Sequence, residues 1–406
     1  MKFKRNKIIA TLIVLLILTL VFFVIKILSE QIATKDYQKR LKEAPVGTFV
    51  KTGDMNLPRA GHSAIKLKDG KILIVGGNKG AEIFDPKTGQ FKLINKKLEP
   101  FDGNKNNSLL LENGNVLVAN KYLFDVKTYQ FKKIDNYDSY LKSFRIRKET
   151  TCFSNSFILS NRRILIIYRY PVAEKKVLFF LYDFKSNKLK EQNITVPSKY
   201  FLPPFDMSLV KGKKILIWTR DYLQSAVKKN TEFILWDYTK NSFKKIGSPI
   251  VKRLEGKMLL LSDNKVLIIG HDTDGIIELL DLESNKIKII GKTKYPRTIS
   301  PSITPIESFK KFFIIGGDVP ICSLYGKICP ENYYSKGKMM SEVYDISNNK
   351  STQSIELERR FHPPMGSNEP QFTVTKLDDK NILITGGAIS GPKTAMRTAL
   401  IYKIGE

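Results

Sequence analysis

The sequence is poor in the residues on which metal and thiol chemistry depend. Its 406 residues include only three cysteines and three histidines. It has no Cys-x-x-Cys pair and no His-Glu-x-x-His motif, so it encodes no recognisable zinc site. A Gly-x-Ser-x-Gly elbow and a glycine-rich phosphate loop are missing as well, which removes the hydrolase and nucleotide-binding classes that those motifs mark. We therefore expect neither a metal nor a cofactor.

Acidic residues are also scarce. The chain carries 68 Lys and Arg against 39 Asp and Glu, a formal net charge of +29. Nine basic and three acidic residues within 1–45 account for +6, which leaves +23 for the other 361 residues. Such a surface attracts anions, among them acidic glycans, anionic polymers and lipid headgroups, although a Lys-, Asn- and Ile-rich genomic composition produces the same excess. No basic run is interleaved with aromatic residues, so a nucleic-acid partner is not expected.

One apolar run is long enough to cross a membrane. Residues 1–7 form a short basic tail, and residues 8–28, "IIATLIVLLILTLVFFVIKIL", carry a single charge, Lys26, near their end. At about 1.5 Å per residue this helix spans a hydrocarbon core of about 30 Å. A cleaved signal peptide is the alternative, but its apolar region is normally shorter and is followed by a small-x-small site, of which "ILSEQIAT" offers only a poor one. We therefore predict a transmembrane helix that is retained as a signal anchor.

The flanks of this helix indicate a topology. The N-terminal tail is short and purely basic, which favours its retention in the cytoplasm and an extracytoplasmic location for the rest. Residues 29–44, "SEQIATKDYQKRLKEA", are polar and compatible with a helix, and Pro45 follows them. We interpret this segment as a polar stalk between the anchor and a domain over residues 45–406.

No long amphipathic helix follows the stalk; short apolar runs alternate with turn residues instead, which indicates an all-β domain. One run recurs seven times: "KILIVGG", "GNVLVAN", "RRILIIYR", "KKILIWTR", "NKVLIIGH", "KKFFIIGG" and "KNILITGG". Each copy is followed by a second element: "EIFD", "YLFD", "FLYD", "ILWD", "ELLD", "EVYD" and "LIYK". Self-similarity at this spacing is the signature of a repeat architecture.

A third element begins about seven residues after the second, which implies a tight turn such as "DPKTGQF". The seventh copy ends at "LIYKIGE" and lacks this element, whereas "APVGTFVKTG", residues 44–53, resembles it at the other end of the domain. A closed ring explains both facts if the segment around Phe49 supplies the outermost strand of the last repeat. Closing the ring leaves only short, protected sheet edges.

These residues resemble the kelch motif. The first copy has an Arg-x-x-His entry, a Leu-x-Asp-Gly hairpin, a double glycine, and an aromatic residue followed by Asp; the entry pair is Arg59 and His62. The double glycines stand at Gly76 and Gly77, Gly316 and Gly317, and Gly386 and Gly387, and copies two to five have lost theirs. The resemblance implies a seven-bladed kelch-type β-propeller that is closed by an N-terminal d strand.

The propeller topology predicts where ligands bind. If each blade has strands a to d from the axis outwards, the b–c and d–a connections emerge on one face, and they are also the connections whose lengths vary. Loops on a rigid scaffold commonly carry binding residues. The candidates for binding carboxylates, phosphates or sugars are Arg169, Tyr170, Arg220, Tyr222, Arg359, Arg360 and Arg397. Their alternative role is that of ordinary solvated loop residues.

The cysteines and histidines give two further expectations. Cys322 and Cys329 share one insertion and form a disulfide if the domain is exported, or two free thiols if it is not. We expect His62 to hydrogen-bond the loop that enters its strand. Kelch-like copper radical oxidases, such as the galactose oxidase family, carry a Tyr-His pair at this entry, whereas here the histidines follow Gly61 and Phe361. A copper radical site therefore lacks its ligand set.

Two functions follow from these features. The first is a membrane-anchored, non-enzymatic recognition or scaffold protein that binds a protein or an anionic polymer or glycan through the b–c and d–a loop face. The alternative is a carbohydrate-active enzyme (an isomerase of the sialic acid type, a lyase or an oxidase) with its site at the channel mouth. Some kelch propellers isomerise sialic acids, but none of their catalytic residues can be matched here by motif, so we assign no catalytic residue.

Overall fold

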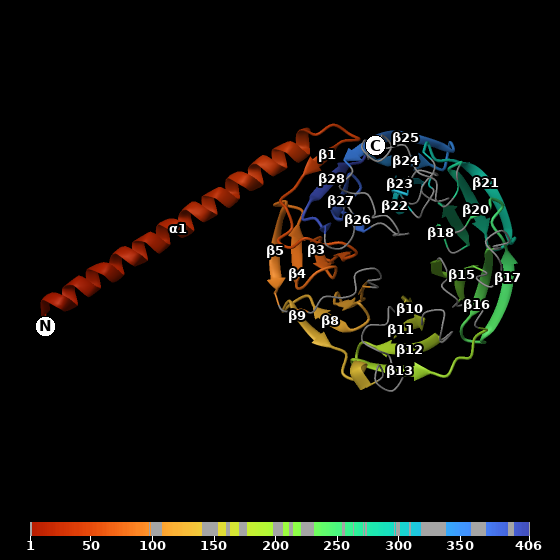
Figure 1. The fold of residues 1–406 in the computed structure, drawn as a ribbon, viewed down its shortest axis with the longest axis horizontal. Coiled ribbons are helices and arrows are strands. Elements are labelled where there is room, and N and C mark those ends of the chain that lie inside the picture. Colours follow the sequence, from red (N-terminus) through yellow and green to blue (C-terminus); the bar gives the residue numbers. More distant parts are fainter. Residues whose placement is uncertain are drawn as a thin grey trace.

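The strands form seven antiparallel four-stranded sheets that are arranged in a ring, with a long helix leaving its rim (Figure 1). This arrangement is a seven-bladed β-propeller, as the repeats predict. The computed structural model describes residues 2–96, 98, 108–139, 153–159, 163–169, 177–197, 206–210, 214–220, 231–253, 256–262, 264–270, 272, 274–295, 297, 301–307, 310–317, 338–358, 371–388 and 394–405.

Six blades are built from consecutive strands. Blade 1 comprises β2 (Ser63–Lys66), β3 (Ile72–Val75), β4 (Ala81–Asp85) and β5 (Gln90–Asn95). Blade 2 comprises β6 (Leu109–Leu110), β7 (Val116–Val118), β8 (Tyr122–Asp125) and β9 (Gln130–Lys133). Blade 3 comprises β10 (Phe153–Leu159), β11 (Arg163–Arg169), β12 (Val177–Asp183) and β13 (Lys188–Gln192). Blade 4 comprises β14 (Asp206–Val210), β15 (Lys214–Arg220), β16 (Thr231–Asp237) and β17 (Ser242–Gly247). Blade 5 comprises β18 (Lys257–Ser262), β19 (Lys265–Ile269), β20 (Ile276–Asp281) and β21 (Lys286–Lys292). Blade 6 comprises β22 (Ser302–Ile306), β23 (Lys311–Ile315), β24 (Lys338–Asp345) and β25 (Lys350–Glu358).

The seventh blade closes the ring. It takes strands a to c from the C-terminal end of the chain, β26 (Phe372–Lys376), β27 (Asn381–Gly386) and β28 (Ala399–Lys403), and strand d from β1 (Phe49–Lys51). Phe49 pairs with Tyr402 in an antiparallel register, and their ring centroids lie 5.1 Å apart. The predicted closure by the segment around Phe49 is therefore confirmed.

The constant spacing between the second and third elements has a local cause. The residues seven apart are cross-strand partners on strands c and d, as Phe84 with Phe91 and Trp236 with Phe243. The aspartate that ends strand c accepts hydrogen bonds from turn amides, for example 2.9 Å from the Lys87 nitrogen to Asp85 Oδ1. Four residues after this aspartate the backbone has a positive φ, which suits glycine and asparagine: these residues are Gly89, Tyr129, Asn187, Asn241, Asn285 and Asn349.

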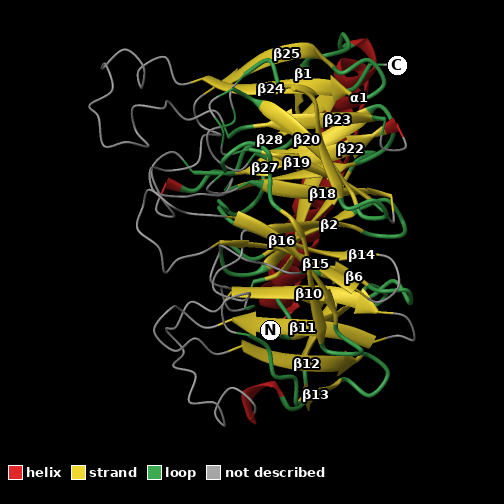
Figure 2. Ribbon diagram, turned by 90° about the vertical axis from the view of Figure 1, so that its right-hand side faces the viewer, coloured by secondary structure: helices red, strands yellow, loops and turns green. Residues whose placement is uncertain are grey.

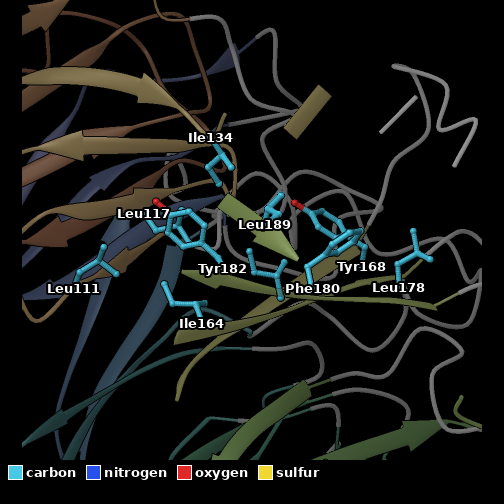
Figure 3. Close-up of a cluster of buried hydrophobic side chains, with 10 residues drawn as sticks. Leu111, Leu117, Ile134, Ile164, Tyr168, Leu178, Phe180, Tyr182 and Leu189 are labelled. Atoms are coloured by element: carbon cyan, nitrogen blue, oxygen red, sulfur yellow. The ribbon is translucent and has the colours of Figure 1, made fainter. Parts of the chain in front are cut away.

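The hydrophobic core consists of seven clusters, one at each contact between neighbouring blades, which we call a seam. Figure 3 shows the cluster at the seam between blades 2 and 3, where Leu117 and Ile134 face Ile164 and Tyr182. Strand b is buried on both faces, as the pattern of β3 shows. A single blade leaves these apolar faces in water, so each blade depends on its neighbours.

Helix α1 (Lys2–Glu43) runs without interruption through the predicted anchor and the predicted stalk. Within the described residues it holds the one segment that is long and apolar enough to span a membrane, and the segment's side chains are exposed. A single-pass membrane protein is consistent with this helix. The helix ends one residue before the Ala44–Pro45 pair, and its last turns lie against the propeller.

Candidate binding face

The connections between strands divide into two opposite faces of the disc, because the strands run across its thickness (Figure 2). On one face the a–b and c–d turns are short in every blade. On the other face the b–c connections differ greatly in length: Val118 of β7 is followed by Tyr122 of β8, whereas Ile315 of β23 is followed by Lys338 of β24. The face with the variable b–c and d–a connections is the candidate binding face.

The structure describes only part of the predicted binding set. Arg169 and Arg220 are the last residues of the b strands β11 and β15, so their backbones reach this face. Arg397 lies in the b–c connection of blade 7. The remaining predicted residues lie outside the described residues: Tyr170, Tyr222, Arg359, Arg360, Cys322 and Cys329.

Arg397 connects two of the variable segments. Its side chain is exposed, and its Nε donates a 2.6 Å hydrogen bond to the carbonyl of Met55, in the d–a connection that enters blade 1. The Met55 nitrogen donates in turn to the Arg397 carbonyl at 2.8 Å. This reciprocal pair holds the b–c connection of blade 7 against the next blade and leaves a guanidinium at the surface.

A buried arginine braces the same face in blade 1. Arg59 and Glu82 are both fully buried, and Arg59 Nε lies 3.1 Å from Glu82 Oε1. Arg59 also donates to the carbonyl of Gly76, at the end of strand b, at 2.7 Å. Glu82 accepts hydrogen bonds from the backbone of Asn56 and Leu57, in the d–a connection. The pair therefore ties the d–a connection to the b–c connection; we call this arrangement an Arg–Glu bridge.

Blades 5 and 6 repeat the bridge. Arg253 Nε lies 2.8 Å from Glu278 Oε2 and Arg253 Nη1 donates to the Gly270 carbonyl, while Arg297 pairs with Glu342 and donates to the Gly316 carbonyl. Glu278 and Glu342 again accept amides of the d–a connection, from Ile250, Val251 and Lys294. In blade 5 Asp272 adds a second carboxylate, 2.7 Å from Arg253.

Sequence reasoning named Arg59 but missed the other members of these bridges. A usable signal exists: the arginine stands four or five residues before strand a, and the glutamate stands three residues before the aspartate that ends strand c. Two charges removed from water are costly unless they are paired and hydrogen-bonded, and here both are. The bridges therefore fix the connections of blades 1, 5 and 6 on the candidate face.

The double glycines serve the same packing. A Cβ on Gly77 would lie 2.4 Å from the Ala60 carbonyl oxygen, and a Cβ on Gly386 would lie 2.4 Å from the Arg59 carbonyl oxygen. Both glycines also have a positive φ. The entry segment of blade 1 thus passes between a glycine of its own blade and a glycine of blade 7, where a side chain would collide with the backbone.

His62 has a different partner from the one expected. Its Nε2 lies 2.8 Å from Thr385 Oγ1 and 3.1 Å from Thr373 Oγ1, on strands β27 and β26 of blade 7. The expectation that it bonds the loop entering its own strand was wrong, because closing the ring places blade 7 against this side chain. Burial, followed by the positive charge of Arg59, lowers the pKa of His62 to about 3. The ring is therefore neutral and holds the seam between blades 7 and 1.

The described residues of the candidate face form neither a well-defined pocket nor a metal-binding group. A hollow lined by Glu112, Asn113, Phe184 and Lys185 lies on the opposite face, beside the a–b turn of blade 2 and the c–d turn of blade 3. Among the residues that the structure describes, no group of three or more His, Cys, Asp or Glu side chains is placed to hold a metal ion.

Comparison with known proteins assigns no family to the chain. No protein-family model matches the sequence, and no curated protein matches it. The propeller is therefore established by the sheet topology, and the resemblance to the kelch motif rests on the motif residues alone.

The bridges differ in the number of carboxylates that face the arginine: Arg59 has one, Glu82, whereas Arg253 has two, Glu278 and Asp272. This difference predicts different costs for removing one of them. Glu82→Gln leaves the buried Arg59 without a carboxylate and is expected to lower the free energy of unfolding by about 3 kcal/mol. Glu278→Gln is expected to cost at least about 1 kcal/mol less, because Asp272 still faces Arg253. Urea unfolding of the full chain in detergent measures both variants. Equal losses would show that Asp272 does not compensate.

The depressed pKa of His62 predicts a pH dependence of stability. The unfolded state binds a proton near pH 6.5, whereas the folded state does so only near 3. The stabilisation is therefore complete above pH 6.5 and is lost as the pH falls toward 3. Between pH 7 and 5 this residue is expected to cost about 2 kcal/mol.

The control for this pH dependence is His62→Gln, which keeps a polar side chain at the seam but does not titrate. Its free energy of unfolding is expected to fall about 2 kcal/mol less than that of the wild type over the same interval. Parallel pH profiles for the two proteins would exclude His62 as the titrating group.

Proposed function

We propose that this protein is a membrane-anchored propeller of the kelch type that recognises a protein or an anionic polymer or glycan through the b–c and d–a loop face. Its N-terminus is cytoplasmic and its propeller is extracytoplasmic. The observation that carries the proposal is the contrast between the two faces of the disc. Short, regular turns occupy one face, and connections of very different length, braced in blades 1, 5 and 6 by buried Arg–Glu bridges, occupy the other.

The braced connections favour recognition because rigid loops lose little conformational freedom on binding. Arg397 is an example, since its backbone and Nε are fixed to Met55 while the guanidinium stays exposed. Arg169 and Arg220 end b strands on the same side of the disc. Arginine at such positions suits planar anionic groups, which it binds with two parallel hydrogen bonds.

The chemistry of the buried acids also favours binding over catalysis. Glu82, Glu278 and Glu342 are committed to arginines and backbone amides. A general acid or base must instead reach a substrate and exchange a proton with it. Within the described chain, the buried carboxylates of the bridges therefore serve the framework.

The arginines of the loop face are expected to control ligand binding. Reversing Arg169, Arg220 and Arg397 to Glu should weaken binding of the full chain to heparin, a sulfated glycan, by more than about tenfold, because three anion contacts become repulsive. The matched control reverses Lys68, Lys185 and Lys380, which are exposed on the opposite face. Surface plasmon resonance on nanodisc-inserted protein measures both. If both triple variants lost heparin affinity to the same extent, net charge alone would explain the effect and the assignment of the face would be refuted.

The proposed topology is tested separately with thiols. In intact cells a membrane-impermeant maleimide is expected to label Cys322 and Cys329 only after an impermeant reductant has been added, because an exported domain oxidises this pair. A Cys152→Ser background removes the third thiol. Labelling without reduction would contradict the disulfide, and labelling only after cell lysis would contradict the extracytoplasmic location.

A further inference from the structure

Helix α1 is part of the propeller's packing. Tyr37 is 2% exposed and belongs to the hydrophobic cluster at the seam between blades 7 and 1, with Ile72 and Phe84 of blade 1 and Ile401 of blade 7. Its hydroxyl donates a 3.1 Å hydrogen bond to the carbonyl of Pro86. Burial raises the pKa of Tyr37 above its usual value. Of the seven seams, this is the one whose cluster includes a described side chain from the helix.

Gly89 makes room for Tyr37. It occupies the positive-φ position of the c–d turn, and a Cβ there would lie 2.7 Å from the Tyr37 ring. The same position is asparagine in blades 3 to 6. The side chains of Asn187 and Asn241 reach the carbonyls of Lys133 and Thr195 of the preceding blade. Tyr37 thus takes the place at this seam that a turn side chain takes elsewhere in the ring.

Two neighbouring residues fix the helix further. Gln38 Nε2 donates to the Lys87 carbonyl at 3.0 Å, and Arg40 Nη1 donates to the Lys51 carbonyl at 2.8 Å. Lys87 belongs to blade 1, and Lys51 belongs to the strand that closes blade 7. Because the membrane segment and this contact are parts of one continuous helix, the propeller's orientation relative to the membrane is set by the docked end of α1.

The helix leaves the rim beside the disc, close to its plane, and does not follow the central axis (Figures 1 and 2). Its N-terminal part extends on the side of the ring where β5 and β9 form the outer edges of blades 1 and 2. Tyr37 stands nine positions after Leu28 in the helix, a rise of about 14 Å. The headgroup layer is about 5–8 Å deep. A disc held at this height stands on edge, with blades 1 and 2 toward the headgroups.

This edge is lysine-rich. Five lysines on the c–d turns and d strands of blades 1 and 2, or directly after them, are exposed: Lys87, Lys92, Lys96, Lys127 and Lys132. We call them the near edge. The far edge, on blades 4 and 5, carries exposed lysines at matching positions: Lys240, Lys244, Lys245, Lys286 and Lys288. Lysines that approach an anionic membrane surface each strengthen association roughly fivefold.

We propose that the near edge binds anionic lipid headgroups, so that the propeller stands on its rim at the membrane and presents both faces sideways. This inference rests on the membrane anchoring in the proposed function. It uses the outer edges of blades 1 and 2 and leaves the loop face free for its own ligand. The docked Tyr37 supplies the orientation, and the near-edge lysines supply the attraction.

The test places a fluorescent amino acid at Gln130, the first residue of β9, in the full chain reconstituted into vesicles with a headgroup-linked quencher. The matched control site is Ser242, the first residue of β17 on the far edge. In vesicles with about 30 mol% phosphatidylserine, quenching at position 130 is expected to exceed that at position 242 by at least about twofold. It should fall in about 1 M NaCl, where screening extends to ~3 Å, toward the smaller excess that the docked helix alone gives.

Two sets of substitutions separate the contribution of the near-edge lysines from that of the docked helix. Lys87→Glu, Lys92→Glu and Lys127→Glu together should reduce the excess quenching at position 130 to the level seen in about 1 M NaCl, whereas Lys240→Glu, Lys244→Glu and Lys286→Glu should leave it unchanged. Gly89→Asn keeps a residue that the turn accepts in four other blades but takes the space of Tyr37. It should release the helix end and reduce the excess quenching, with the propeller still folded.

The outcomes distinguish this inference from the proposal on which it rests. Extraction of the wild-type protein from vesicles by alkaline carbonate would refute the anchor itself. Stable insertion with equal quenching at positions 130 and 242, or with equal effects of the two lysine sets, would refute the near edge alone. If quenching at position 130 were as strong in neutral phosphatidylcholine vesicles as in vesicles with phosphatidylserine, the recognition of anionic headgroups would be refuted. Protection of the near-edge lysines by soluble heparin without lipid quenching would assign the edge to a glycan instead.

Discussion

The structure depends on one constraint: each blade buries the faces of its sheet only against its two neighbours. Seven seams therefore replace a single core, and the ring is stable only if the last seam closes. Because β1 pairs with β28, blade 7 is built from both ends of the domain, and its cluster with blade 6 includes Phe49 and Tyr402. Closure joins residues about 350 positions apart in the chain.

The seam between blades 7 and 1 combines three interactions that join distant parts of the chain. His62 crosses it to Thr373 and Thr385, the carbonyl of Arg59 accepts the amide of Gly387, and Tyr37 enters it from the helix. The N-terminal helix is thus joined to the propeller at the place where the ring closes. Docking of the helix and closure of the ring are therefore coupled.

The Arg–Glu bridges likewise hold together segments of the loop face that are distant in the chain. In blades 1, 5 and 6 a buried arginine holds the carbonyl that ends strand b, while its glutamate holds the amides of the d–a connection. The backbone groups of irregular segments are satisfied without added secondary structure. Variable loops can then differ in length and residue type while their ends stay fixed, which suits a surface that recognises a partner.

The sequence by itself determined the features that arise within one blade. The seven-residue step from strand c to strand d, the aspartate that caps the turn and the glycine or asparagine with positive φ are local, so their spacing revealed the blades, their number and the missing strand at Phe49. The kelch-like double glycines were visible for the same reason. Of the predicted binding residues the structure describes Arg397 and the strand ends at Arg169 and Arg220, and the binding role of the whole set stays a prediction.

Only the tertiary structure decided the contacts between blades. Nothing near Gly89 in the chain indicates that Tyr37 fills the space above it, and nothing near His62 indicates Thr385. The glutamates of the bridges lie 23 to 45 residues from their arginines, across connections of unequal length, so no fixed spacing shows which arginine pairs with which glutamate. Such pairs exist because closing a ring brings together faces whose separation along the chain has no constant value.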